Sequence, residues 1–381
     1  MYTKGVIRVR RIAAIAAALL LLSGCGLGRG IYSNYRPLED LQPVRTLGVD
    51  AGPVLSAAAT HLPDSAPTIL RRAASSIPAG LDALQQRTPR GQLYFDHTQY
   101  IVLGQRYAEE GVDAVLDFVE RDIHTRMGAA LFVLRGAKAE ALVTGSGADW
   151  DVGDVLATVV AETDKRGDSH VFDVRETAVA LSEYGAALVC ALSLADTEGS
   201  VFALAPGLAA VPDGYGILKD GALTGFLDGD EAQAASLMLG KLGTVTREAP
   251  CGGGTVTLEL SCGAPEITLS ELGLLIRAAP TAVISGVNTA ADVTDAAVQD
   301  ALTAYADAAL SGDLTALIAR SKAENCDFLA LGRALRRQGV DPAALPERWL
   351  ETLPVSVRVE TALRGSYDLS SRAGTDGGGG A

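Results

Sequence analysis

The first 25 residues constrain this chain most, because they spell an export signal that ends in a lipid-attachment motif. A cationic start precedes the apolar segment 12–22, which is too short to span a bilayer and has the length typical of a signal peptide. The four residues Leu22 to Cys25 then form a lipobox. We expect residues 1–24 to be a lipoprotein signal peptide, so everything after them folds as an exported body whose mature N-terminus is Cys25.

The thiol of Cys25 is the expected lipidation site. It would carry a covalent diacylglyceryl group, and the freed amine would accept a further acyl chain such as palmitate. Because each buried methylene contributes about 0.8 kcal/mol, two or three such chains hold a folded body on a bilayer without a transmembrane helix. The alternative is an ordinary cleaved signal in which the cysteine is incidental.

The charge of the chain excludes several kinds of partner. Its formal net charge is −14, and loss of the four cationic side chains of the signal peptide makes the mature chain about −18. Such a body has no basic surface to replace the counterions of phosphates, so we expect no nucleic-acid binding. Anionic lipid headgroups would also repel it, which leaves the covalent lipid as the expected membrane attachment.

The remaining cysteines and the histidines predict no metal site. Cys190 lies in an apolar run and is expected to be buried, and the four histidines are scattered singly, without the spacing of zinc ligands. Cys251 and Cys262 flank a glycine turn and an alternating segment. A hairpin there would bring them together as a disulfide, but two free thiols are equally compatible with the pattern. No cofactor is expected beyond the lipid.

Alternation of strands and helices predicts the N-terminal architecture. Residues 93–104 contain a continuous apolar run typical of a strand covered on both faces, and residues 109–120 place Val112, Val115, Leu116 and Val119 on one helical stripe. Residues 127–134 return as a second strand. A strand, a helix and a strand in this order predict a parallel pair with a right-handed crossover.

The composition changes after residue 200. Short alternating segments rich in glycine predict a small, mostly antiparallel middle domain over residues 201–269. Residues 290–323 form the longest helical pattern, which Ser311 and Gly312 are expected to interrupt or kink. Residues 353–363 alternate as one half-buried strand.

These patterns predict an α+β fold with three mixed α/β domains behind the signal peptide. The expected limits are residues 25–200 for the N-terminal domain, 201–269 for the middle domain and 270–370 for the C-terminal α+β domain. The glycine-rich residues 371–381 cannot bury enough surface to offset their ordering entropy, and we expect a disordered tail.

No catalytic motif is present in the sequence. Gly145, Ser146 and Gly147 lack the spacing of a nucleophile elbow, and the glycines at 252–254 lead into a strand instead of a helix that receives a phosphate. Acidic groups such as Asp149 with Asp151, or Asp228 with Asp230 and Glu231, lie in loops or at a helix start, where capping and solvation are the usual roles. We therefore predict that the chain is not an enzyme.

Three features outside this account have both a structural and an interfacial interpretation. His97 follows Phe95 and Asp96 and is expected to bond Asp96 or the backbone. Arg121, Asp122 and Arg126 would form a charged cluster that fixes a loop or faces a partner. Trp349 is expected in the core, with an exposed anchor as the alternative.

Three groups of residues, taken together with the lipobox, resemble one known family. The first group is Phe95, Asp96, His97, Ala108, Gly111, Val115, Leu116, Asp117, Phe118, Arg121, Asp122 and Arg126. The second is Gly216, Ile217, Leu218, Lys219, Asp220, Leu223, Gly225, Leu227, Asp228 and Leu239 to Lys241. The third is Asp327, Phe328, Leu331, Gly332, Arg333, Trp349, Leu353 and Val355 to Gly365. In order and spacing they are similar to the Ger(x)C family, the lipoprotein C subunits of spore germinant receptors.

The resemblance implies a three-domain lipoprotein on the outer face of the cell membrane, which is the inner membrane of the spore. It implies contacts with two integral membrane subunits, of the A and B type, and a role in nutrient-triggered germination without enzyme activity. Whether this subunit contacts a small-molecule germinant stays open. The alternatives are a solute-binding envelope lipoprotein, which needs a deep polar cleft between similar lobes, and a cell-envelope hydrolase, which needs convergent catalytic groups.

Overall fold

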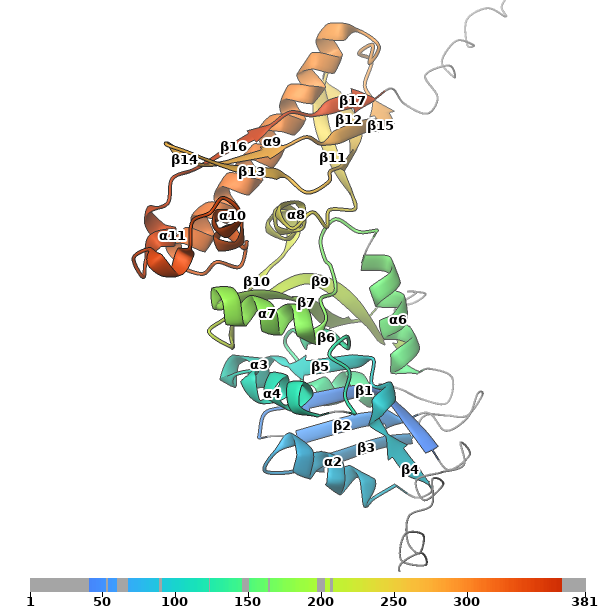
Figure 1. The fold of residues 1–381 in the computed structure, drawn as a ribbon. Helices are drawn as coiled ribbons and strands as arrows, with labels where there is room; N and C mark the ends of the chain where they lie inside the picture. The colour runs from blue at the N-terminus through green and yellow to red at the C-terminus, as the bar shows by residue number, and fades with distance from the viewer. Residues whose placement is uncertain are drawn as a thin grey trace, which may run out of the picture.

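A ten-stranded mixed sheet organises the N-terminal part of the molecule (Figure 1). The computed structural model describes residues 41–52, 54–59, 68–88, 91–122, 124–145, 151–163, 165–196, 203–205 and 208–364. Cys25 and residues 371–381 lie outside these ranges, so the lipidation site and the disordered tail stay predictions.

The path of the sheet is β10-β9-β7-β6-β5-β1-β2-β3, with β4 paired to β1 and β8 paired to β9. Its strands are β1 Leu41–Asp50, β2 Val54–Ala59, β3 Thr68–Ala73, β4 Gln92–Tyr94, β5 Tyr100–Gly104, β6 Ala130–Leu134, β7 Ala186–Ala195, β8 Ala203–Ala205, β9 Leu208–Lys219 and β10 Ala222–Leu227. The central strands β1, β5, β6 and β7 pair in parallel, whereas β2, β3, β9 and β10 are added antiparallel. The predicted parallel pair with a helical crossover is confirmed for β5 and β6.

Helices cover both faces of this sheet. They are α2 Ile77–Gln85, α3 Gln105–Glu110, α4 Asp113–Arg121, α5 Ala139–Val143, α6 Val152–Thr163 and α7 Val174–Tyr184, with a 3-10 turn, η2, at Phe95–His97. Along β6, Leu131 and Val133 join the core beneath α2, α4 and α7, and Phe132 and Leu134 join the core beneath α5 and α6. Because successive side chains of a strand point to opposite faces, an apolar run is what two-sided burial requires.

The C-terminal part contains two smaller sheets and one long helix (Figure 1). One sheet has the order β11-β12-β15-β17 and the other β13-β14-β16. The strands are β11 Thr244–Cys251, β12 Gly254–Ser261, β13 Glu266–Ser270, β14 Gly273–Ala278, β15 Thr281–Asn288, β16 Val355–Val359 and β17 Ala362–Arg364. The helices are α8 Gly229–Met238, α9 Ala296–Ala323, α10 Leu331–Arg337 and α11 Trp349–Thr352, with a 3-10 turn, η3, at Pro342–Ala344.

Helix α9 supplies the apolar stripe that joins these elements into one core. Its buried side chains recur three or four residues apart and are Leu302, Ala306, Leu310, Leu314, Leu317 and Ile318. The same core contains α8 and the inner faces of both sheets, together with Leu331 and Leu335 of α10. The α+β class is therefore confirmed, with helices and mixed sheets in both parts of the chain.

Two strands lie in a different sheet from the one expected. Residues 216–219 and 223–227 were predicted within a small middle domain, but they belong to β9 and β10, which complete the ten-stranded sheet through β7. The glycine content that suggested a separate domain has a local cause: a side chain at Gly214, whose φ is +72°, would meet the carbonyl oxygen of Leu227 at 2.0 Å. The domain limits themselves stay a prediction.

Two helices also differ from expectation. The helix predicted over 109–120 is two helices, because Gly111 adopts a φ of 128° and the N–H of Val112 donates to the carbonyl of Gly221 at 2.7 Å. The predicted interruption at Ser311 and Gly312 is wrong, since α9 runs unbroken through them. A helical glycine costs about 1 kcal/mol, which is less than burial of the neighbouring leucines contributes.

The final predicted strand is divided between the two small sheets. β16 pairs with β14, and β17 pairs with β15. Between them, the N–H of Thr361 donates to Asp307 of α9 at 2.7 Å instead of to a neighbouring strand. A contact with a residue 54 positions away in sequence thus follows the end of β16. The alternating pattern of the sequence does not reveal this break.

Candidate functional site

The described residues contain no group of histidine, cysteine and acidic side chains suited to hold a metal ion. The acidic side chains that the sequence singled out form ion pairs with arginines where the structure describes them. Asp228 pairs with Arg135, Asp230 with Arg247 and Glu231 with Arg320. Asp151 pairs with Arg45 at 3.2 Å, and Asp149 lies outside the described residues.

The cysteines of the described part are free thiols. Register decides the case of Cys251 and Cys262: Cys251 pairs with Gly254 at the turn of the β11–β12 hairpin, whereas Cys262 follows Ser261 at its open end. The disulfide alternative is therefore wrong, because the two residues occupy opposite ends of one hairpin. Cys190 is fully buried as predicted, and desolvation raises the pKa of its thiol far above its ordinary value.

Two segments from the first group of resemblance residues, η2 and the loop after α4, contact each other. Asp96 from η2 contacts His124, which follows α4, with 3.2 Å between the carboxylate oxygen and Nδ1. Of the two partners expected for His97, Asp96 and the backbone, Asp96 contacts His124 instead, and the ring of His97 packs edge-on against Tyr94 with centroids 5.2 Å apart. His124 is a residue that the sequence did not single out.

The charged cluster at the end of α4 is largely local. Arg121 pairs with Asp117 one turn earlier at 2.6 Å, and Asp122 accepts a hydrogen bond from the hydroxyl of Thr125 at 2.6 Å. This cluster, with Asp96 and His124, holds the loop between α4 and β6. It also borders two surface hollows between α2 and α4, of about 740 and 850 Å³.

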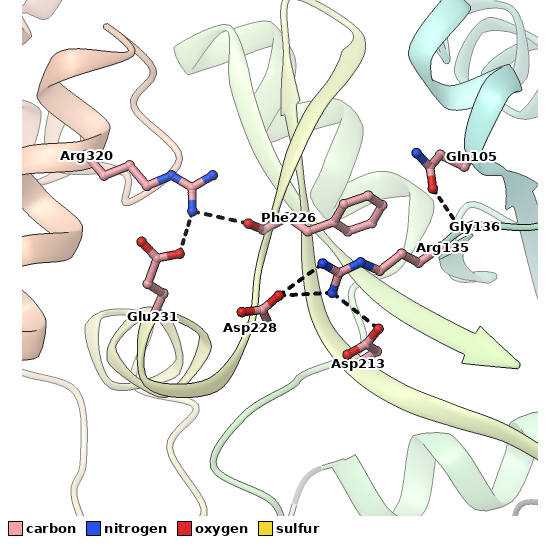
Figure 2. A network of polar contacts seen from close by, with 8 residues as sticks. All are labelled: Gln105, Arg135, Gly136, Asp213, Phe226, Asp228, Glu231 and Arg320. Carbon is pink, nitrogen blue, oxygen red and sulfur yellow. Dashed lines mark hydrogen bonds and ion pairs between the residues drawn. The ribbon is translucent and has the colours of Figure 1, made fainter. Parts of the chain in front are cut away.

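A polar network joins the N-terminal sheet to the C-terminal core, and Figure 2 shows it. Arg135, which follows β6, contacts Asp213 at 3.3 Å and Asp228 at 3.0 Å, and its guanidinium lies 4.7 Å above the ring of Phe226. The carbonyl of Phe226 in turn accepts from Arg320 of α9 at 3.2 Å. One residue of β10 therefore bridges an arginine from each part of the chain.

Arg320 completes the junction on the C-terminal side. It pairs with Glu231 of α8 and with Glu324, the C-cap residue of α9. Gly225 permits the approach, because a Cβ there would lie 3.3 Å from the guanidinium. Nearby, Lys219 donates to the carbonyl of Glu324 at 2.7 Å. These contacts position α9 against the edge of the large sheet.

In the third group of resemblance residues, the buried carboxylate of Asp327 caps the start of α10, and we call this contact the Asp327 clasp. Asp327 is 7% exposed and accepts from the backbone N–H groups of Leu331 and Gly332, each at 2.7 Å. Desolvation raises the pKa of its carboxyl to about 7, against the two hydrogen bonds that lower it. A Cβ at residue 332 would lie 2.9 Å from the carboxylate, which explains glycine at that position.

The clasp lies beside the junction between the two parts of the molecule. Asp327 and Phe328 line a hollow of about 300 Å³ against α7 and β7. Arg336 of α10 spans the same junction, 3.4 Å from the carboxylate of Glu183 and 5.3 Å above the ring of Tyr184. Trp349 is half-buried and packs against the C-terminal core, as its helical context predicted.

The comparisons with known proteins agree with this arrangement of the chain. A family model described as the spore germination protein N-terminal domain matches residues 34–193, and one described as spore germination B3/GerAC like, C-terminal, matches residues 213–367. Together they cover most of the chain, which defines a spore germination protein. The chain belongs to the Ger(x)C family of spore germination proteins.

A solved structure is also similar to this chain. The crystal structure of the GerBC protein matches over 84% of this chain and 96% of its own, with 16% sequence identity and a TM-score of 0.49. No curated protein matches.

Proposed function

We propose that this chain is the lipid-anchored C subunit of a spore germinant receptor. Diacylglyceryl on Cys25 would hold it at the outer face of the cell membrane, which becomes the inner membrane of the spore. There it would contact integral membrane subunits of the A and B type and take part in nutrient-triggered germination, without an enzyme activity of its own. The family match over both parts of the chain is the observation that carries this proposal.

Two further observations support attachment through a lipid. The lipobox ends at Cys25 with the signal-peptide features described above. In the part of the chain that the structure describes, no helix has both the length and the apolarity to cross a bilayer. Acyl chains on a mature N-terminal cysteine would supply the attachment of a protein that acts beside membrane subunits.

The proposal is tested with Cys25→Ala in cells that form spores. We expect this variant to lose incorporation of labelled fatty acid, to leave the membrane fraction and to impair nutrient-triggered germination. Cys262→Ala is the matched control, because Cys262 is a free thiol far along the chain, and it should keep all three properties. Tight membrane association of unlabelled Cys25→Ala would contradict the anchor.

The receptor role is tested separately by purifying the wild-type chain from detergent-solubilised spore membranes. Co-purification of integral membrane subunits is the expected result. Recovery of a bound small solute with no membrane subunit would instead support the solute-binding alternative.

A further inference from the structure

A crevice between α2 and α4 offers an unpartnered surface on the N-terminal part. Two hollows form it, of about 740 and 850 Å³, and they share the lining residues Pro78, Phe118 and Asp122. We call this surface the α2–α4 crevice. Its walls come largely from α2 and α4, and both helices also contribute side chains to the core that contains Leu131 and Val133.

The crevice has an apolar floor and an acidic rim. Leu81 and Phe118 are half-buried against the core and still line the hollows, and Ala114 is exposed beside them. Acidic side chains surround this floor: Asp82, Asp96, Glu110, Asp117 and Asp122.

Two basic residues that line the hollows already contact acidic side chains. Arg121 is bound to Asp117, and His124 is bound to Asp96. Within the described ranges, no positively charged side chain contacts Asp82 or Asp122. An occupant must therefore bring apolar side chains for the floor and positive charge for the rim, because complementary charge selects partners and like charge opposes them.

The backbone around the crevice argues for a helical occupant. An extended segment that binds by strand addition would need a free strand edge to pair its own N–H and C=O groups, whereas a helix satisfies them internally. The strand beside the crevice is β4, and its Leu93 N–H already donates to the side chain of Gln85 at 2.8 Å. The helical walls α2 and α4 use their backbone groups within the helices.

We propose that the α2–α4 crevice binds a basic amphipathic helix of a partner subunit. Apolar side chains of that helix would pack on Leu81, Ala114 and Phe118, and its lysine or arginine side chains would meet Asp82 and Asp122. This proposal rests on the proposed function, because it assigns one contact of the assembled receptor to a particular surface.

Charge reversal at the rim tests the crevice in the full-length, membrane-anchored chain. Asp82→Lys places a like charge against a basic partner, so we expect at least a tenfold loss of co-purified membrane subunits. Asp300→Lys on the exposed side of α9 makes the same change in net charge and should leave recovery unchanged. Equal recovery with wild-type, Asp82→Lys and Asp300→Lys overturns the crevice proposal and leaves the receptor role intact. Failure of the wild-type chain to recover any membrane subunit overturns the receptor role itself.

Site-specific photo-cross-linking identifies the occupant. A photoreactive residue in place of Ala114 should cross-link to a partner peptide with net positive charge and apolar residues three and four positions apart. A cross-link to residues 26–40 of this chain, to a second copy, to lipid or to an uncharged or acidic peptide overturns the proposal. Absence of any cross-link at this position overturns it as well.

Discussion

The two parts of the chain bury their apolar residues in different ways. In the ten-stranded sheet, the central strands are covered on both faces, so successive residues of β5 and β6 enter two separate cores. In the C-terminal part, one helix serves two small sheets, and a single core collects α8, α9 and α10 and extends onto Leu188 of β7 and Ile217 of β9 in the large sheet. Burial in the N-terminal part is therefore spread over many strands. Burial in the C-terminal part depends on the apolar side chains of α9.

Both parts nevertheless use a buried aspartate to cap a short helix. Asp50 is 4% exposed and accepts from the N–H groups of Ala139 at 2.7 Å and Glu140 at 2.9 Å. Burial raises the pKa of Asp50, and it raises that of Asp327 to about 7. The first N–H groups of a helix have no partner within the helix, and the two aspartate side chains accept hydrogen bonds from them. Their burial, rather than any catalytic pairing, explains the perturbed carboxyl groups.

The largest expected effect comes from the core between β6 and α5–α6. Phe132 is fully buried there, and Phe132→Ala should lower the free energy of unfolding by about 3–5 kcal/mol through lost burial and the cavity that remains. Chemical denaturation followed by circular dichroism measures the change. Hydrogen exchange should accelerate first in β5, β6 and β7.

Leu314→Ala is the matched change in the other part, since Leu314 is fully buried on the stripe of α9. We expect a loss of about 2–4 kcal/mol with exchange accelerating in α9 and the two small sheets. If both variants accelerate exchange equally throughout the molecule, the two parts unfold as one unit and the proposed contrast between them is wrong.

A smaller effect should appear in the pH dependence of the Asp327 clasp. Its pKa is about 7 in the folded chain and ordinarily about 3.9. Between these values the folded state holds a proton that the unfolded state releases, so stability contributed by this group is present below about pH 4 and falls as the pH rises to 7. Over the part of this span between pH 5 and pH 7, the loss of stability corresponds to roughly 2–3 kcal/mol.

Asp327→Asn removes this titration, so the decline in unfolding free energy from pH 5 to pH 8 should flatten. Denaturation at the two pH values measures it. Asp300→Asn, at an exposed site on α9, should keep the wild-type slope. An unchanged slope in Asp327→Asn would show that the buried carboxyl group does not titrate in this range.

The smallest effect is expected at the junction between the parts. Arg320→Gln loses its ion pairs with Glu231 and Glu324, but these groups are partly exposed, so about 1 kcal/mol is expected. A double-mutant cycle with Glu231→Gln measures the coupling. Arg121→Gln disrupts a fully exposed pair within α4, which solvent screens, so its cost should be smaller than that of Arg320→Gln. A cost at Arg320 no larger than at Arg121 would mean that the junction does not depend on this network.

The apolar periodicity of the sequence predicted many of the helices and strands, but it predicted few of the ion pairs between distant segments. The apolar run 100–103 and the stripe from Val112 to Val119 identified buried elements correctly, because periodicity reports directly on burial. His124, Arg135 and Arg320 gave no comparable signal. Their partners lie 28, 93 and 89 positions away in sequence, so only the folded chain brings these charges together.

The sequence by itself determined the acidic charge, the lipobox at Cys25, the alternation of helices and strands and the family resemblance. Each of these depends on neighbouring residues or on composition. Tertiary structure alone decided that β9 and β10 complete the large sheet, that residues 353–363 divide between two sheets and that α2 and α4 border a crevice. Those outcomes depend on contacts between distant segments, which compete with local preference and override it where they bury more apolar surface or satisfy more backbone hydrogen bonds.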